Sequence, residues 1–219
     1  MGFIRYESRF QAGQILAELL DKQNSKLKSK ITNQNTFCYT IPNGGVPVAE
    51  GFCDALDLQY DLLIVRKVKI PYNTEAGFGS VTTDGTVLLN ESLMQHLDLT
   101  EQQIQESIQL TKGEIQERLK LYNKSIDLTE IYTECIKGKF IFMMDDGLAS
   151  GFTMLAAIKM IKKYHPEKIF IAVPTAPLST IKRFKGEVDE IFCPNIRDVW
   201  QFAVADAYRR WYDVPESEV

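Results

Sequence analysis

The chain has 219 residues, 45% of them hydrophobic and 25% charged, which is the composition of an ordinary globular protein able to bury its own core. Its formal net charge of −4 argues against nonspecific nucleic-acid binding, which needs many Lys and Arg against phosphates. The sequence contains neither an apolar run of about 18 residues nor a secretion signal, and its four cysteines show no CxxC spacing. We therefore expect a single cytoplasmic domain over residues 1–219 with free buried thiols and with neither membrane nor nucleic acid as a partner.

The first third of the chain predicts a helix, a strand and a second helix. Residues 5–23 place apolar side chains on one helical stripe, and the polar residues 24–35 predict a surface loop. A short β-favouring run at 37–41 ends at Pro-Asn-Gly-Gly before helical periodicity resumes. Paired glycines allow backbone N–H groups to approach an anion, although most Gly-Gly turns are only turns.

A second apolar strand, residues 61–65, is followed at once by Arg66, Lys67 and Lys69. Three cations at a strand end suit a polyphosphate, and a solvated charge run is the alternative. The segment 71–79 (PYNTEAGFG) is predicted to be a mobile loop, and Asp84-Gly85 between SVTT and TVLL predicts a hairpin. A lone loop glutamate such as Glu75 is usually solvated, but it can also act as an acid or base.

A capping box at Thr100 opens a long helix, within which Glu114 and Arg118 have the spacing of a stabilising i, i+4 pair. The apolar stripe of this helix suits either an insertion that packs on the sheet or a subunit contact in a homodimer. The sequence leaves both alternatives open.

The most informative stretch is residues 139–153, KFIFMMDDGLASGFT. Its apolar run 140–144 predicts a central parallel strand covered on both faces. Asp145 and Asp146 then emerge at the carboxyl edge, where open α/β sheets bind ligands. Small residues form a turn into a helix that Ser150 or Thr153 can cap, and the N–H groups at such a helix start bind phosphate. Phosphate beside two carboxylates fits a ligand that carries phosphate at one end and hydroxyls or a divalent cation at the other.

Three other interpretations of the Asp145-Asp146 pair compete. The aspartates could merely solvate a loop, or they could hold magnesium in a nucleoside triphosphatase, but the chain contains no GxxxxGK[ST]. A receiver-type phosphorylation pocket would place its acids near the start of the domain. His96 and His165 accompany no Ser or Cys motif, so a hydrolytic triad is not expected.

The remaining pattern completes a doubly wound rhythm of strands and helices. Residues 168–173 predict a parallel strand, 179–188 predict a short helix, and 190–193 predict an edge strand. We therefore expect an α/β fold, a three-layer α/β/α sandwich with a mainly parallel sheet of five or six strands and an added hairpin. The C-terminal segment 195–219 is rich in aromatic residues that either stack on a flat heterocycle or cover the sheet edge, the latter being favoured.

The string from Asp145 to Thr153 resembles the phosphoribosyl pyrophosphate signature of the type I phosphoribosyltransferases, with Gly147 in place of the usual aliphatic residue. The string PNGGVPVA is similar to PRGGVPVA in one subgroup of that family, so that Asn43 replaces an arginine. The resemblance covers residues 5–219, including the aromatic tail.

The resemblance implies a role for each matching residue. Asp145 and Asp146 would be catalytic and would hold the ribose hydroxyls and Mg²⁺, with Glu75 as a further acid or base in a flexible flap at 67–90; residues 92–123 would be a helical insertion. The ribose-phosphate site would consist of Asp145, Asp146, Gly147, Ala149, Ser150, Gly151, Phe152 and Thr153. The pyrophosphate site would consist of Asn43, Gly44, Gly45, Arg66 and Lys67.

The implied activity is transfer of a 5-phosphoribosyl group from phosphoribosyl pyrophosphate to a nitrogenous base, with release of pyrophosphate. Family members that act on 6-oxopurines often have an acid where this chain has Ala149, which disfavours hypoxanthine and guanine. The missing charge at Asn43 keeps a second interpretation open, a non-catalytic sensor or regulator that binds phosphoribosyl pyrophosphate or a nucleotide.

Overall fold

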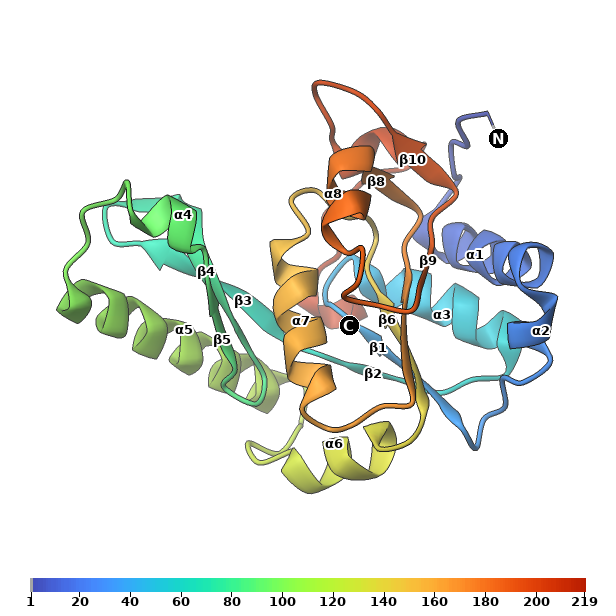
Figure 1. Cartoon of the computed structure of the whole chain (residues 1–219), viewed down its shortest axis with the longest axis horizontal. Helices are drawn as coiled ribbons and strands as arrows, with labels where there is room; N and C mark the ends of the chain where they lie inside the picture. Colours follow the sequence, from blue (N-terminus) through green and yellow to red (C-terminus); the bar gives the residue numbers. More distant parts are fainter. Residues whose placement is uncertain (1) are drawn as a thin grey trace.

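A five-stranded parallel sheet with the strand order β2-β1-β6-β7-β9 forms the centre of the molecule in a computed structural model (Figure 1). The structure describes residues 2–219, apart from the side chains of Thr74 and Glu75. The strands are β1 (Thr36–Thr40), β2 (Tyr60–Leu62), β6 (Phe140–Met144), β7 (Lys168–Ala172) and β9 (Glu190–Phe192). The predicted central strand is confirmed as β6, all five of whose residues are buried, and β9 lies at one edge as predicted.

Helices cover both faces of this sheet and complete the predicted three-layer α/β/α sandwich. The helices α1 (Arg9–Gln23) and α3 (Gly45–Leu56) lie on one face, and α6 (Thr129–Ile136) and α7 (Phe152–Lys162) lie on the other (Figure 1). Alternate residues of β6 point to opposite faces. Phe142 belongs to the hydrophobic cluster beneath α1 and α3, and Met143 belongs to the cluster beneath α6 and α7. This two-sided burial explains why the strand sequence is apolar without interruption.

A smaller antiparallel sheet extends to the left of the core in Figure 1. It consists of β3 (Val65–Ile70), β4 (Asn73–Thr82) and β5 (Val87–Leu89), and α4 (Glu91–Met94) follows it. The hairpin at Asp84-Gly85 is confirmed. Two expectations were wrong, because residues 73–79 belong to β4 and do not form a loop, and Arg66, Lys67 and Lys69 lie within β3 instead of following a strand.

The long helix α5 (Glu101–Leu121) begins with the predicted capping box at Thr100. Its apolar stripe contacts β3 and β4 of the same chain, and a homodimer contact stays a prediction. The predicted pair between Glu114 and Arg118 is not formed. Glu114 instead binds Arg66 and Lys69 of β3, with N–O distances of 3.5 and 3.1 Å.

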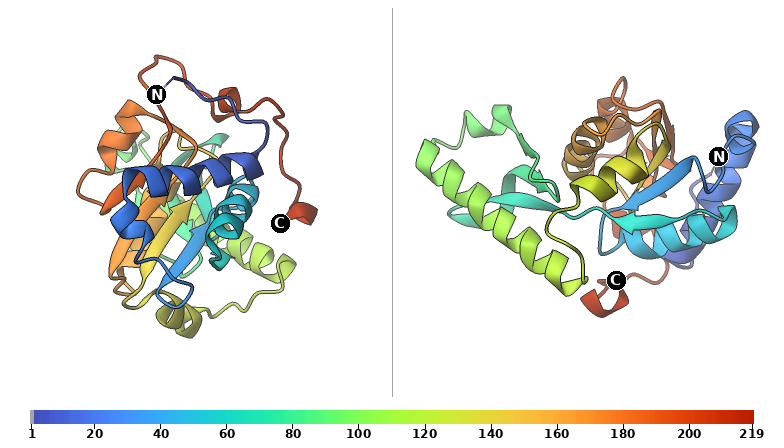
Figure 2. Two further views of the ribbon diagram at one scale, coloured as in Figure 1. Left: turned by 90° about the vertical axis from the view of Figure 1, so that its right-hand side faces the viewer. Right: turned by 90° about the horizontal axis from the view of Figure 1, so that it is seen from below.

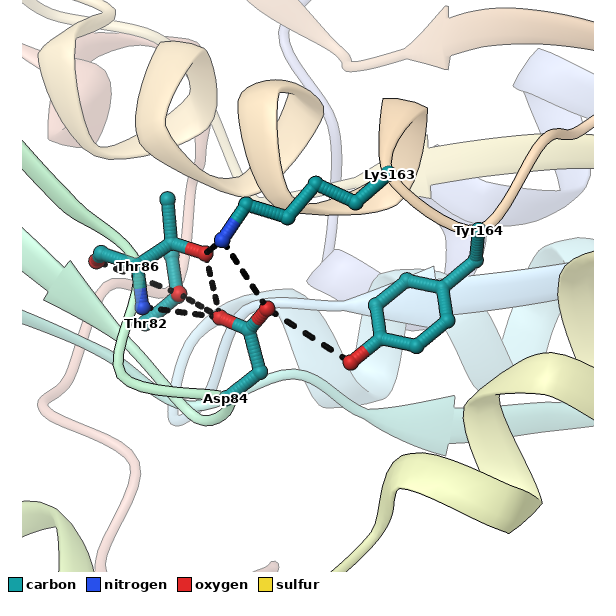
Figure 3. Close-up of polar contacts among 5 residues, drawn as sticks. All are labelled: Thr82, Asp84, Thr86, Lys163 and Tyr164. Atoms are coloured by element: carbon teal, nitrogen blue, oxygen red, sulfur yellow. Dashed lines mark hydrogen bonds and ion pairs between the residues drawn. The ribbon is translucent and has the colours of Figure 1, made fainter.

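The tip of the hairpin is fastened to the core by the carboxylate of Asp84 (Figure 3). Its Oδ1 accepts hydrogen bonds from Thr82 Oγ1 and from the backbone N–H of Thr86, at 2.7 and 2.8 Å. Its Oδ2 lies 3.5 Å from both Lys163 Nζ and the hydroxyl of Tyr164, beyond the end of α7. Burial alone would raise the pKa of Asp84, but these hydrogen bonds and the Lys163 charge lower it.

This contact predicts a pH-dependent contribution to stability. Because the pKa of Asp84 is lower in the folded state, its stabilisation is present above the ordinary value of about 4 and is lost as the pH falls through the folded-state value. We expect Asp84→Asn to reduce the free energy of unfolding by about 1–2 kcal/mol at pH 7 and by progressively less below pH of about 4. Urea unfolding across pH measures this, with the exposed Asp54→Asn as the control. A deficit that does not change with pH would contradict the prediction.

The C-terminal third adds a two-stranded sheet of β8 (Thr175–Pro177) and β10 (Asn195–Arg197), the helix α8 (Leu178–Arg183) and the 3₁₀ helices η1 (Val204–Ala207) and η2 (Glu216–Glu218). A one-turn helix α2 (Ser25–Lys28) interrupts the predicted loop at 24–35. The favoured prediction for the aromatic tail was largely wrong, because Tyr208 is buried while Trp200, Trp211 and Tyr212 are exposed. No helix in the described residues is long and apolar enough to span a membrane. All four cysteines are free thiols, of which Cys135 is only half-buried.

Candidate active site

Two half-buried aspartates follow β6 at the carboxyl edge of the sheet, where the sequence places them. Asp146 Oδ2 accepts a 2.9 Å hydrogen bond from Nε of the buried Arg9 on α1. The same carboxylate lies against the turn before α3, since a Cβ on Gly44 would stand 2.1 Å from Asp146 Oδ2. Asp145 accepts the N–H of Asp146 at 2.8 Å. The two predicted turns therefore meet at the aspartate pair.

The aspartate pair carries an electrostatic cost. Burial and the neighbouring charge of Asp146 raise the pKa of Asp145 well above its ordinary range. Burial also raises the pKa of Asp146, although the Arg9 guanidinium opposes the rise. Two crowded carboxylates that repel each other can accept hydrogen bonds from the hydroxyl groups of a ligand, or they can bind a cation.

The turn after the aspartates leads into α7 and leaves a helix N-terminus open. Gly151 occupies the N-cap position with φ of 73°, a left-handed conformation that glycine adopts without strain. The expected caps are not in that position, although Ser150 Oγ accepts the N–H of Phe152 at 3.3 Å. Thr180 and Arg183 of α8 hold the turn from outside, donating to the carbonyl oxygens of Ala149 and Ser150 at 2.5 and 2.8 Å.

A cavity of about 270 Å³ adjoins this turn and separates it from the small sheet. Lys67 and Arg183 contribute cations to its lining, together with Ser150 and Thr153. Ser80 from β4 also lines the cavity, and its buried hydroxyl has no hydrogen-bond partner. A buried hydroxyl without a partner is uncommon and marks a position where a ligand oxygen could bind.

The glycine turn at 43–45 contacts two distant segments through the side chain of Asn43. Its Nδ2 donates to the carbonyl oxygen of Val214 at 2.9 Å, and its Oδ1 accepts from Arg118 Nη1 at 3.0 Å. The structure divides the predicted pyrophosphate residues, because neighbouring strand residues point to opposite faces. Lys67 faces the cavity at residues 150–153, whereas Arg66 faces Glu114 on α5.

Comparison with known proteins identifies the family. Residues 7–207 match the family model of the phosphoribosyl transferase domain. The chain belongs to this family. Within the matched residues lie the aspartate pair, the turn at 149–153 and the glycine turn at 43–45.

The relatives of this phosphoribosyl transferase domain include two Mycobacterium tuberculosis proteins, from strains CDC 1551 and H37Rv, whose names give phosphoribosyl transferase as an unproven activity. Each is 30% identical over 217 residues, which is 98% of this chain but only 45% of the relative. Among solved structures, the protein TT1426 from Thermus thermophilus superposes with a TM-score of 0.72 at 24% identity, covering 99% of this chain and 96% of that one. The structural likeness supports the fold alone.

The departure at Gly147 has a local explanation in this phosphoribosyl transferase domain. A Cβ at this position would stand 2.7 Å from a methyl group of Val204 and 2.9 Å from one of Thr175. The segment that contains η1 therefore packs directly on the turn, and an aliphatic residue at 147 would displace it. Tyr208, just beyond η1, also donates its hydroxyl to the Asp146 carbonyl oxygen at 2.6 Å.

Several residues of the candidate site were missed from the sequence. Arg9 lies in a helix whose stripe predicted only packing, and Arg183 and Ser80 belong to segments without a motif. Arg118 was assigned to a surface pair. A spacing pattern reports neighbours a few residues apart, whereas Arg9 and Arg118 contact partners 137 and 75 residues away in the sequence, and Arg183 contacts Ser150 from 33 residues away. Glu75 lies on β4, and its side chain is outside the described residues.

Proposed function

We propose that the protein transfers the 5-phosphoribosyl group of phosphoribosyl pyrophosphate to a nitrogenous base and releases pyrophosphate. One observation carries the proposal: the aspartate pair Asp145-Asp146 lies next to the glycine turn 43–45 and directly before the turn 149–153. The ligand has pyrophosphate, sugar hydroxyls and a 5-phosphate in a matching order. Membership of the phosphoribosyl transferase domain family supports the same class of reaction.

In this proposal Asp145 and Asp146 bind the 2- and 3-hydroxyls of the ribose and help to hold Mg²⁺. Among the described side chains, no group of three His, Cys, Asp or Glu could form a metal site. Mg²⁺ is often bound by one or two carboxylates together with substrate phosphates and water, so a two-aspartate site fits an ion that enters with its ligand. The ion would offset phosphate charge during the reaction.

The 5-phosphate would bind at residues 149–153, where the first N–H groups of α7 have no partner within the helix. Lys67 and Arg183 would add positive charge from the cavity wall, and the Ser80 hydroxyl would donate a hydrogen bond. We assign pyrophosphate to the turn formed by Asn43, Gly44 and Gly45, with Arg66 nearby on β3.

Catalysis in such a site is mainly electrostatic. As pyrophosphate departs, the anomeric carbon gains positive charge, which the nearby carboxylates stabilise while the ligand is held in position. We further propose Glu75 as an acid or base, within a flap of residues 67–90 that closes over the sugar. In this account residues 92–123 are the helical insertion of a single cytoplasmic domain spanning 1–219.

A second candidate function is a non-catalytic sensor of phosphoribosyl pyrophosphate or a nucleotide. The observation that favours it is that Asn43 has a neutral side chain, and that both of its polar atoms are already hydrogen-bonded, to Val214 and to Arg118. Such a site would bind the ligand without releasing pyrophosphate.

Turnover separates the two functions. We expect the protein, incubated with phosphoribosyl pyrophosphate, Mg²⁺ and a panel of purine and pyrimidine bases, to release pyrophosphate with at least one base, and hypoxanthine and guanine to be poor acceptors. Coupled-enzyme detection of pyrophosphate provides the measurement, and omission of the base provides the control for hydrolysis. Tight binding of phosphoribosyl pyrophosphate with no release for any base would support the sensor instead.

A further inference from the structure

The C-terminal segment 211–219, which we call the tail, crosses the carboxyl edge of the sheet and is fastened at three points. The carbonyl oxygen of Tyr212 accepts from Arg9 Nη1 at 3.0 Å, and that of Val214 accepts from Asn43 Nδ2 at 2.9 Å. Beyond these, Glu216 Oε1 pairs with Arg118 Nη2 at 2.5 Å. Figure 2 shows η2 beside the C-terminal end of α5 in both views. The tail thus runs from the aspartate side of the site to the glycine turn.

Arg118 is the cation at the end of this path. Its Nη1 donates both to Asn43 Oδ1 at 3.0 Å and to the Tyr122 hydroxyl at 3.2 Å, while its Nη2 pairs with Glu216. Its side chain is 21% exposed, so the guanidinium is partly shielded but remains open to solvent. The positive charge of Arg118 therefore lies against Asn43, the one residue of the glycine turn 43–45 that has a polar side chain.

Glu216 is held in this place as a carboxylate. Partial burial would raise its pKa, but hydrogen bonds from Tyr122 and Asn43 and the charges of Arg118 and Arg66 lower it. On the other side of the contact, burial and the bond to Glu216 raise the pKa of Tyr122 to about 12, so that its hydroxyl remains a donor. Arg118 and the Tyr122 hydroxyl thus both contact one carboxylate beside the glycine turn, an arrangement that recognises an anion.

We propose that Arg118 is a pyrophosphate-binding residue and that Glu216 occupies its guanidinium until a pyrophosphate-bearing ligand displaces the tail carboxylate. This inference rests on the proposed function, because it takes the turn at 43–45 as the pyrophosphate site. Pyrophosphate carries more negative charge than a single carboxylate and offers several oxygens to the guanidinium, so it can replace Glu216. Arg118 thereby supplies, from α5, the charge that Asn43 lacks.

Titration of the full chain with magnesium pyrophosphate tests the inference. Ribose 5-phosphate serves as a second probe, because it is expected to bind at the turn 149–153 and not at Arg118. We expect Arg118→Gln to weaken pyrophosphate binding at least about tenfold and to leave the Kd for ribose 5-phosphate within about twofold. We expect Glu216→Gln to tighten pyrophosphate binding by about threefold or more, because the competing carboxylate is gone. In the double variant the gain from Glu216→Gln should vanish.

Two matched controls are available in the same chain. Glu218→Gln changes a second carboxylate of the tail, which bonds to Tyr212 and does not contact Arg118, and Arg209→Gln breaks an exposed pair with Glu7. Neither control should alter pyrophosphate affinity. A purely structural Arg118 predicts lower thermal stability with an unchanged Kd for pyrophosphate.

An unchanged Kd in Arg118→Gln or in Glu216→Gln would overturn the inference, and so would a parent chain that binds no pyrophosphate. These outcomes leave the proposed function intact if the parent binds ribose 5-phosphate and turns over. Failure of the parent to bind ribose 5-phosphate would instead contradict the proposed function.

Discussion

Replacing both Asp145 and Asp146 with asparagine should abolish pyrophosphate release while leaving the protein folded. The two carboxylates are the groups closest to the proposed sugar, and removing one preorganised electrostatic group typically costs about 10²–10³ in rate. Because the pair acts as a unit, we expect a combined loss of at least about a thousandfold and no simple sum of single effects. Steady-state pyrophosphate release by the parent and the variant gives the comparison.

The structural reason for expecting the fold to survive lies in the crowding of the pair. Two adjacent, half-buried carboxylates repel each other, and an asparagine at 146 can still accept the hydrogen bond from Arg9 Nε. The melting temperature should stay close to that of the parent, because relief of the repulsion offsets the loss of the ion pair between Asp146 and Arg9. The exposed pair Asp54→Asn with Asp57→Asn removes the same charge from the C-terminal end of α3 and should retain full turnover. Retained turnover in the site variant, or its failure to fold, would refute this expectation.

Gly44→Ala should damage both stability and turnover, because there is no room for a side chain at this turn. The added Cβ would stand 2.1 Å from Asp146 Oδ2 and 2.6 Å from its Cγ, so the carboxylate must move away from Arg9. Arg9 is only 5% exposed, and breaking a buried pair costs about 3–5 kcal/mol. The remaining bond to Tyr212 and the 15% exposure of Asp146 reduce our expectation to about 2–3 kcal/mol.

The same displacement should lower turnover about a hundredfold, the usual effect of misplacing a binding group by about 1 Å. Differential scanning calorimetry and the pyrophosphate assay measure the two effects. Gly113→Ala in α5 is the matched control, since a Cβ there meets nothing within 4 Å and a helical glycine is replaced by a better helix former. That control should be slightly stabilised and fully active. Parent-like melting and turnover in Gly44→Ala would show that the carboxylate does not lie against the turn.

Local patterns predicted much of this fold because the relevant forces act over short spans of sequence. The apolar run of β6, the capping box of α5 and the Asp84-Gly85 hairpin each depend on neighbouring residues, and all three are confirmed. The predicted boundaries around β3 were wrong because a local pattern takes no account of distant packing partners. Arg66 and Lys67 were predicted to follow a strand as a run of charges. In the structure they lie within β3 and point to opposite faces, Arg66 toward Glu114 on α5 and Lys67 toward the cavity.

The candidate site was predictable where a motif names its residues and unpredictable where it is assembled from distant helices. Asp145 and Asp146 lie at the sheet edge as expected, beside the predicted glycine turn. Arg9 and Arg118 occupy helices that carry ordinary amphipathic patterns, and nothing in those patterns indicates contact with Asp146 or Asn43. The aromatic side chains of residues 195–219 were expected to cover the sheet edge, but backbone carbonyl groups of this segment and Glu216 make the contacts that bear on the site.

The most direct test is a crystal structure of the parent chain soaked with ribose 5-phosphate and Mg²⁺. The account predicts phosphate oxygens within hydrogen-bonding distance of the N–H groups between Ser150 and Thr153, with the sugar hydroxyls at Asp145 and Asp146. A sugar phosphate bound elsewhere, or this turn empty at saturating ligand, would contradict it.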